Sequence, residues 1–164
     1  MKTLLHVFAV LGFFGMSDGA WPHDKIEQDE KTSAALVKQQ MAWGIAGDPS
    51  KAGRTIHVAM SDAMRFTPDK IDVKVGETLK FVIKNDGKLL HEFVLGTEKT
   101  LSEHAAMMAK HPQMAHDEPY MVHVDPGRIG QIVWTFNRPG QFDFACLIAG
   151  HYQAGMVGKI NVLK

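Results

Sequence analysis

This chain of 164 residues contains a single cysteine, Cys146. A single thiol excludes an intramolecular disulfide and the thiolate-rich sites that hold structural zinc or iron–sulfur clusters. Net charge is also absent, since 18 basic residues balance 18 acidic ones. This balance excludes the polybasic surface of a nucleic-acid-binding protein. Histidine and methionine, by contrast, are abundant, with nine and ten copies, and together they favour a soft or borderline metal ion such as copper.

Long apolar runs are rare as well, and the clearest one lies at the amino end. Residues 1–20 combine a positive charge at Lys2, an apolar stretch over 4–16 and small residues up to Ala20. That stretch is shorter than the ~20 residues of a membrane-spanning helix, and the pattern is typical of a secretory signal peptide. A buried amino-terminal helix or strand is the alternative interpretation. We therefore expect an exported protein with no membrane association after signal cleavage.

The segment 21–53 is predicted to form a helical arm followed by a linker. Residues 24–43 are mostly good helix formers with a partial apolar face, which includes Met41 and Trp43. Residues 44–53 carry Gly, Asp and Pro, which favour a linker. These features predict that one domain spans the remainder of the chain, 54–164.

From residue 54 onward the hydrophobic pattern has a period of two residues, which predicts β-strands. In one of them Leu79, Phe81 and Ile83 share a face, and the Asp86-Gly87 pair that follows favours a hairpin turn. The predicted strands cover 55–60, 70–75, 78–85, 89–95, 120–124, 130–136, 141–146 and 155–163. Short strands with regular turns between them predict an all-β fold, either an antiparallel sandwich or a Greek-key barrel.

Residues 97–119 interrupt the strand pattern with an insertion rich in methionine and histidine. The segment 100–103 has the form of a capping box and predicts a short helix, which His111-Pro112 would end. Two interpretations of the insertion remain open. It forms either a second, loose copper site or an amphipathic lid whose methionines pack on the sandwich. The side chains concerned are His104, Met107, Met108 and His111, which share one helix face, and then Met114, His116, Met121 and His123.

The most informative stretch runs from Cys146 to Met156 and places a thiol, an imidazole and a thioether in one loop. Four residues separate Cys146 from His151, and four more separate His151 from Met156. Glycines in the loop permit the tight turns that would point these side chains inward. One more imidazole completes a His₂Cys set with a weak axial Met, which is the ligand set of a blue-copper site. His91, in a predicted strand, supplies that imidazole.

These motifs resemble those of the cupredoxins, the plastocyanin/azurin family of small copper proteins. The resemblance runs from Thr55 to the carboxyl terminus and is greatest to the exported copper-tolerance cupredoxins of bacteria. Their M-R-F-x-P, H-E-F and G-H-Y-x-A-G-M segments match residues 64–68, 91–93 and 150–156. The resemblance implies a cupredoxin-like Greek-key β-sandwich with one type 1 copper ion. It also implies three equatorial ligands and one axial ligand, which are His91, Cys146, His151 and, axially, Met156.

Two positions depart from the pattern of many cupredoxins. Glu92 follows the first ligand histidine, where many members have Asn. Ala149-Gly150 precedes the second, where many have Pro. Both changes bear on the rigidity and the electronic tuning of the site, which the axial bond and the surrounding hydrogen bonds govern. Whether the centre is blue or green therefore stays open.

The resemblance implies a role in copper tolerance in the bacterial periplasm, through copper binding and redox. A soluble electron carrier between redox enzymes is the alternative function, and a copper chaperone is a third. Catalysis is not expected, because Ala145 and Leu147 flank Cys146, whereas multicopper oxidases and copper nitrite reductases have a histidine beside this cysteine.

A redox partner protein would dock near His151. An apolar rim is expected around this residue, although ordinary packing around a ligand loop explains the same side chains equally well. They are Leu147, Ile148, Ala149 and Tyr152.

Overall fold

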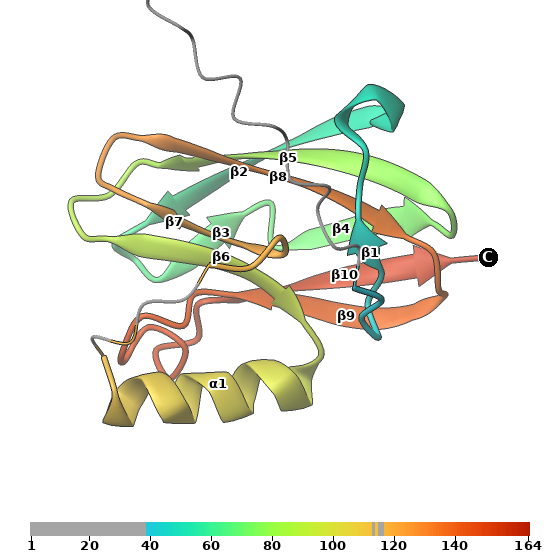
Figure 1. Cartoon of the computed structure of the whole chain (residues 1–164). Coiled ribbons are helices and arrows are strands. Elements are labelled where there is room, and N and C mark those ends of the chain that lie inside the picture. The colour runs from blue at the N-terminus through green and yellow to red at the C-terminus, as the bar shows by residue number, and fades with distance from the viewer. Residues whose placement is uncertain (1–38, 113, 115–116) are drawn as a thin grey trace, which may run out of the picture. The chain divides into compact units, whose positions relative to one another are not determined.

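The described part of the chain folds as a sandwich of two five-stranded β-sheets, with a helix packed beside one of them (Figure 1). The computed structural model describes residues 39–112, 114 and 117–164. The predicted signal peptide and most of the predicted arm lie outside these residues. In chain order the elements are β1 (Ile45–Ala46), the 3₁₀ turn η1 (Pro49–Lys51), β2 (Arg54–Ser61), β3 (Arg65–Thr67), β4 (Lys70–Lys74), β5 (Glu77–Asn85), β6 (His91–Gly96), α1 (Glu98–Lys110), β7 (Met121–Val124), β8 (Ile129–Phe136), β9 (Gly140–Ala145) and β10 (Val157–Leu163).

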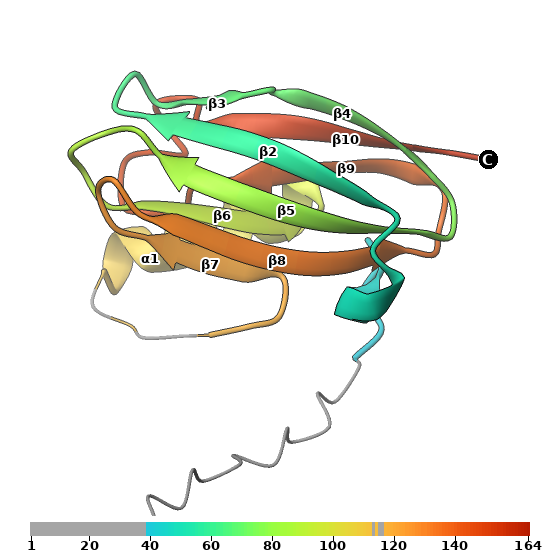
Figure 2. The ribbon, with the colours of Figure 1, turned by 90° about the horizontal axis from the view of Figure 1, so that it is seen from above.

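The first sheet has the strand order β1-β8-β5-β2-β3, and the second has the order β4-β10-β9-β6-β7. The predicted sandwich is confirmed, but its sheets are mixed rather than purely antiparallel. β2 pairs with β5 in parallel, and β4 pairs with β10 in parallel. The chain leaves the first sheet after β3, enters the second as β4 and returns as β5, as Figure 2 shows. A period of two residues indicates which face of a strand is buried, but it does not indicate strand direction.

The predicted hairpin at Asp86-Gly87 is also wrong, because β5 and β6 lie in different sheets. The buried side chain of Asn85 organises this connection instead. Its amide nitrogen donates to the carbonyls of Leu89 and Val124, at 2.8 Å each, and its carbonyl oxygen accepts from the Gly87 N–H at 2.9 Å. These bonds hold the end of β5 beside the start of β6, where His91 lies.

Apolar side chains from both sheets fill the space between them. Leu79, Phe81 and Ile83 are fully buried, as their alternation predicts. Phe93 of β6 stacks on Phe144 of β9, with ring centroids 4.9 Å apart. Phe144 lies two residues before Cys146, so this aromatic contact also fixes the strand end that leads into the proposed ligand loop.

Residues 39–53 differ from their prediction. The described end of the predicted helix, 39–43, is not helical: Met41 and Gly44 form a bridge across a tight turn, and β1 then pairs with β8. Trp43 is only 4% exposed, and its carbonyl accepts a hydrogen bond from Trp134 Nε1 at 3.0 Å. The stretch 44–53 therefore contains a short strand and a 3₁₀ turn rather than a bare linker. Burial of the tryptophan outweighs the helix-forming tendency of the residues that precede it.

The predicted helical insertion is confirmed, although α1 begins earlier than expected. Its N-cap is Thr97, whose hydroxyl accepts from the Thr100 backbone N–H at 3.2 Å, while the Thr100 hydroxyl accepts from the Thr97 N–H at 2.9 Å. The capping box thus lies one turn before the predicted segment 100–103. The helix ends before His111, as predicted. In the described part of the chain, helices lack the length and apolarity needed to cross a membrane.

Candidate metal centre

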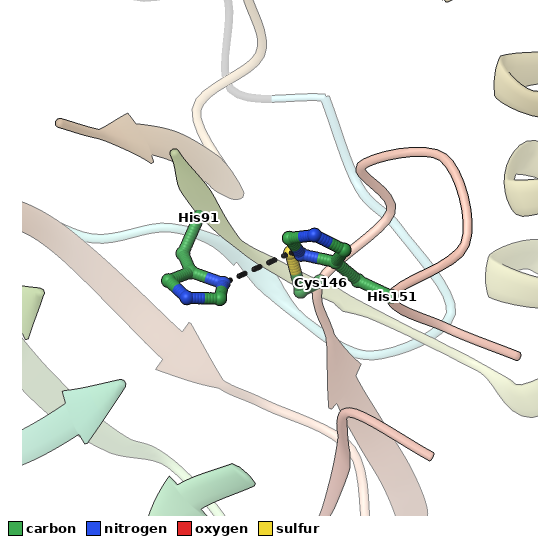
Figure 3. Close-up of side chains that lie close together, drawn as sticks. All are labelled: His91, Cys146 and His151. Atoms are coloured by element: carbon green, nitrogen blue, oxygen red, sulfur yellow. Dashed lines mark hydrogen bonds between the residues drawn. The ribbon is translucent and has the colours of Figure 1, made fainter. Parts of the chain in front are cut away.

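Three of the four predicted ligand residues lie at the ends of strands of the second sheet, and the fourth lies in the loop that joins two of these strands. His91 opens β6, Cys146 directly follows β9, His151 lies in the loop after it, and Met156 directly precedes β10. Since β9 pairs antiparallel with both β6 and β10, these strand ends meet at one end of the sandwich. Figure 3 shows that the side chains of His91, Cys146 and His151 converge there.

Both imidazole rings present Nδ1 to the thiol. Cys146 Sγ lies 3.3 Å from His151 Nδ1 and 3.9 Å from His91 Nδ1. The ligand atoms of the three residues all lie within 4.8 Å of one another, and the ring centroids of the two histidines are 4.9 Å apart. One thiol and two imidazoles around a shared point match the trigonal His₂Cys donor set that binds copper.

The site is buried on one side and reaches the surface on the other. His91, Cys146 and Met156 have no exposed side-chain surface, whereas His151 is partly exposed. Burial raises the pKa of the Cys146 thiol to about 12. Hydrogen bonds from the backbone N–H groups of Glu92 and Ile148 act in the opposite direction and lower this pKa, whereas the charge of the Glu92 carboxylate raises it further. A buried thiolate here needs a bound cation, so the donor set fits a metal ion that displaces the thiol proton.

The loop that carries three of the predicted ligands is closed by its own backbone. The Cys146 N–H donates to the Met156 carbonyl at 3.1 Å, and the Met156 N–H donates to the His151 carbonyl at 3.1 Å. Gly150 and Gly155 have φ angles of 91° and 86°, which favour glycine. The tight turns predicted from these glycines are thus present, and they hold the backbone of Met156 against that of Cys146.

Arg65 of β3 closes the loop from outside. Its guanidinium donates to the carbonyl of Ala154 at 3.1 Å and to that of Gly155 at 3.4 Å. Arg65 belongs to the M-R-F-x-P segment that the sequence comparison with cupredoxins singled out. Its contacts explain why this distant segment accompanies the ligand loop: the arginine donates to two carbonyls at the end of the loop, of which that of Gly155 also accepts from the Val157 N–H at 2.9 Å.

Sequence reasoning missed Asp62, which lies between β2 and β3. Its Oδ1 is 3.1 Å from Nε2 of His91, the ring nitrogen that faces away from Cys146. The carboxylate also accepts from the backbone N–H groups of Lys88 and Leu89, at 2.8 and 3.2 Å. The Lys88 hydrogen bond is the largest influence on the pKa of Asp62, which lies below its usual value. A single aspartate in a loop gives no sequence signal for this contact.

The two histidines differ in their surroundings. Burial, and then the neighbouring His91, lower the pKa of His151, while Asp62 opposes this effect. A lowered pKa keeps the His151 ring neutral near pH 7, so that a ring nitrogen has a lone pair available for a metal ion. The His151 imidazole is therefore suited to act as a neutral ligand.

Glu92, the residue that departs from the common cupredoxin pattern, is fully buried beside the site. Its backbone N–H donates to Cys146 Sγ at 3.3 Å. Its carboxylate lies 3.2 Å from Nε2 of His123, which faces it across the β6–β7 pair and is 39% exposed. The backbone contact to the sulfur therefore persists although the side chain differs.

The apolar rim expected around His151 is only partly present. Leu147 is 1% exposed and packs with Met108 beneath α1, so it does not belong to a rim. Ile148 and Tyr152 are partly buried against the core, and Ala149 is exposed. Exposed apolar side chains occur instead directly before His91, and these are Leu89 and Leu90.

The methionines and histidines of the insertion separate into different environments. Met108 and Met121 are buried under the helix, as the packing interpretation predicts. Another group lines a surface cleft together with Glu103, Glu118 and Tyr120, namely His104, Met107 and Met114. His111 is exposed, and His116 lies outside the described residues. Among the described residues, the convergent group of three His, Cys, Asp or Glu donors is His91, Cys146 and His151.

Comparison with known proteins defines the class. The family model of the copper binding proteins of the plastocyanin/azurin family matches residues 54–163. The chain therefore belongs to this family, and its His-Cys-His cluster is compatible with a type 1 copper site.

Two curated relatives from different bacteria share one name. The chain is 52% identical over 120 residues to the copper-resistant cuproprotein CopI of Rubrivivax gelatinosus, covering 73% of each protein. It is 39% identical over 150 residues to the protein of that name from Pseudomonas aeruginosa, covering 74% of this chain and 82% of the relative. Among solved structures, reduced auracyanin from Roseiflexus castenholzii is similar in fold, with a TM-score of 0.59 at 21% identity over 67% of this chain and 97% of that one.

Proposed function

We propose that the protein binds one copper ion through His91, Cys146 and His151 as equatorial ligands and Met156 as the axial ligand. The observation that carries this proposal is the convergence of two Nδ1 atoms on one buried thiol. The assignment of Met156 as the axial ligand is supported by the burial of its side chain and by the backbone hydrogen bond that joins it to Cys146.

The residues of the site suit a metal ion that changes oxidation state. Copper would supply one-electron redox chemistry, since thiolate and thioether favour Cu(I) while imidazole binds both states. The chain contributes a frame that holds the ligand atoms of His91, Cys146 and His151 within 4.8 Å of one another. Hydrogen bonds within the ligand loop and the contacts of Arg65 resist rearrangement of that frame. A frame that rearranges little favours fast electron transfer.

We propose copper resistance as the biological role, because the curated relatives at 52% and 39% identity bear that name. The amino-terminal pattern of residues 1–20 supports export, which would place the site in the periplasm. We further propose that the protein is not an enzyme. In support, Ala145 and Leu147 flank Cys146, so the adjacent histidine that links a type 1 site to a second copper centre is absent from the sequence.

An electron carrier is the second candidate function. The partial exposure of His151 favours it, because this ring offers a path from the buried site to the surface. The neighbouring leucines, Leu89 at 48% and Leu90 at 39% exposed, add an apolar surface next to His91. A redox partner would dock there, close to His151.

Copper titration tests the site. The wild-type chain should bind one copper ion and develop an intense thiolate-to-copper absorption band. Cys146→Ser should remove the band, and His151→Ala should alter it strongly. His57→Ala is the matched control, because His57 is an exposed histidine on β2, and this variant should behave as wild type. Survival of the band in Cys146→Ser would contradict the proposal.

A growth assay separates the two roles. Cells that lack their own copper-resistance protein should tolerate more copper when they export the wild-type chain, and Cys146→Ser should give no protection. If the wild-type chain gives no protection but exchanges electrons rapidly with itself, the electron-carrier function is favoured instead.

A further inference from the structure

The side chain of Asp62 links two loops to the proposed copper site. Asp62 directly follows β2, whereas Lys88, Leu89 and His91 belong to the connection from β5 and the start of β6. Oδ2 of Asp62 accepts from the Lys88 N–H at 2.8 Å. Oδ1 accepts from the Leu89 N–H at 3.2 Å and lies 3.1 Å from His91 Nε2. One carboxylate thus contacts three nitrogen atoms, and the third belongs to a proposed copper ligand.

These contacts determine which ring nitrogen of His91 carries the proton. An ionised carboxylate has no hydrogen to donate, so the contact with Nε2 is a hydrogen bond only if Nε2 carries the hydrogen. In the neutral ring the other nitrogen, Nδ1, then carries the lone pair, and it faces Cys146 Sγ at 3.9 Å. Because the His91 side chain is completely buried, water does not replace Asp62 as the acceptor.

Gly87 makes room for this arrangement. A Cβ atom added to Gly87 would overlap the Oδ1 atom of Asp62. The Asp86-Gly87 pair, which the sequence suggested as a hairpin turn, therefore serves another purpose: its glycine lets the carboxylate approach the backbone. A carboxylate held in this way keeps a fixed direction toward the imidazole.

We infer that Asp62 is a positioning residue for the copper site, which orients His91, fixes its proton on Nε2 and makes its Nδ1 a more basic ligand. This inference rests on the proposed function and adds to it a residue from outside the ligand motifs. Carboxylates that accept a hydrogen bond from a metal-binding imidazole act in this way, and their loss lowers metal affinity roughly 10–100-fold. A more basic imidazole also favours Cu(II), so Asp62 lowers the reduction potential of the centre.

The test compares Asp62→Ala and Asp62→Asn with Asp86→Asn. The control removes the same charge from the nearby connection, where Asp86 is exposed and pairs with Lys84 rather than with His91. The first measurement uses metal-free protein: the ¹⁵N chemical shifts of the histidine rings report which nitrogen of His91 is protonated. The second and third measure Cu(II) affinity and reduction potential. Thermal unfolding of each metal-free variant monitors the loop contacts to Lys88 and Leu89.

Wild type and Asp86→Asn should show His91 protonated on Nε2 alone. Asp62→Ala should give a mixture of tautomers, Cu(II) affinity 10–100-fold lower and a higher reduction potential. Asp62→Asn keeps one acceptor oxygen but no charge. That oxygen keeps the tautomer only if it faces His91 Nε2, in which case the amide NH₂ loses the Lys88 hydrogen bond, and the loss of charge should raise the potential in either orientation. The Asp62→Asn variant also tests the inference if the Asp62→Ala variant fails to fold.

An Asp62→Ala protein with the wild-type tautomer, affinity and potential would overturn the inference. If only Asp62→Asn folds, a potential and an affinity equal to those of Asp86→Asn would overturn it. Failure of the proposed function looks different, because the wild-type chain would then lack the thiolate-to-copper band. The tautomer of metal-free His91 would still decide whether Asp62 positions the ring.

Discussion

The backbone N–H of Cys146 donates to the carbonyl of Met156 at 3.1 Å, so the two ends of the ligand loop are joined directly. The nine residues between them therefore form a closed turn that presents His151 toward the thiol. This closure holds the backbone of Met156 against that of Cys146, at the start of the β9–β10 pairing. It explains how a short segment supplies three of the four proposed ligands.

The axial role of Met156 predicts a change of properties without loss of the site. Met156→Leu preserves size and apolarity at a fully buried position, so the free energy of unfolding should fall by less than about 1.5 kcal/mol. The thiolate-to-copper band should persist but shift, and the reduction potential should rise because the thioether is lost. Visible spectroscopy and voltammetry of the variant check both effects. An unchanged spectrum and potential would remove Met156 from the ligand set.

Arg65 should act on the ligand loop rather than on the whole fold. Arg65→Ala removes the donors to the carbonyls of Ala154 and Gly155, so copper should dissociate faster into a competing chelator. Because Arg65 is exposed, the unfolding free energy should change by less than about 1 kcal/mol. Arg54→Ala is the control, since Arg54 bonds to Glu77 and the Asp72 carbonyl instead. Equal dissociation rates in the two variants would count against the role of Arg65.

Close packing around Phe144 predicts a stability effect at a glycine. A Cβ on Gly158 of β10 would overlap the ring of Phe144, which is held by its stacking on Phe93. Gly158→Ala should therefore lower the free energy of unfolding by about 1–3 kcal/mol. A Cβ on Gly53 would meet nothing within 4 Å, so Gly53→Ala is the control and should have little effect. Chemical denaturation of both variants makes the comparison, and similar midpoints would contradict this packing.

The methionines of α1 should differ in their effect on stability. Met108 is 3% exposed, so Met108→Ala should lower the unfolding free energy by roughly 2–5 kcal/mol. Met107 is 41% exposed and lines the surface cleft, so Met107→Ala should change it by less than about 0.5 kcal/mol. Denaturation curves of the metal-free variants check this difference. A large loss in Met107→Ala would show that the cleft residues pack like core residues.

Features local in sequence were predicted well. The alternation in β5 identified its buried face, because side chains on a strand point alternately to opposite sides. The spacing Cys146-His151-Met156 predicted that these three residues share one loop, which the structure shows, because a short loop keeps them close whatever the remaining topology. His91 was assigned with the help of the H-E-F motif, and the structure brings its Nδ1 to 3.9 Å from Cys146 Sγ.

Features that depend on long-range pairing were not predicted. Parallel pairing of β2 with β5 arises from passage of the chain between two sheets, which hydrophobic alternation does not report. The burial of Trp43 depends on Trp134, which lies 91 residues away. Asp62 contacts His91 across 29 residues of sequence, and an aspartate in a loop is too common to signal such a contact.

X-ray absorption at the copper edge tests the central claim most directly, because it measures which atoms surround the ion. For the protein loaded with one copper ion, we predict one short copper–sulfur distance and two imidazole nitrogen ligands. In Cys146→Ser the short copper–sulfur distance should disappear. A copper ion surrounded only by nitrogen and oxygen in the wild-type chain would contradict the assignment of Cys146 as its central ligand.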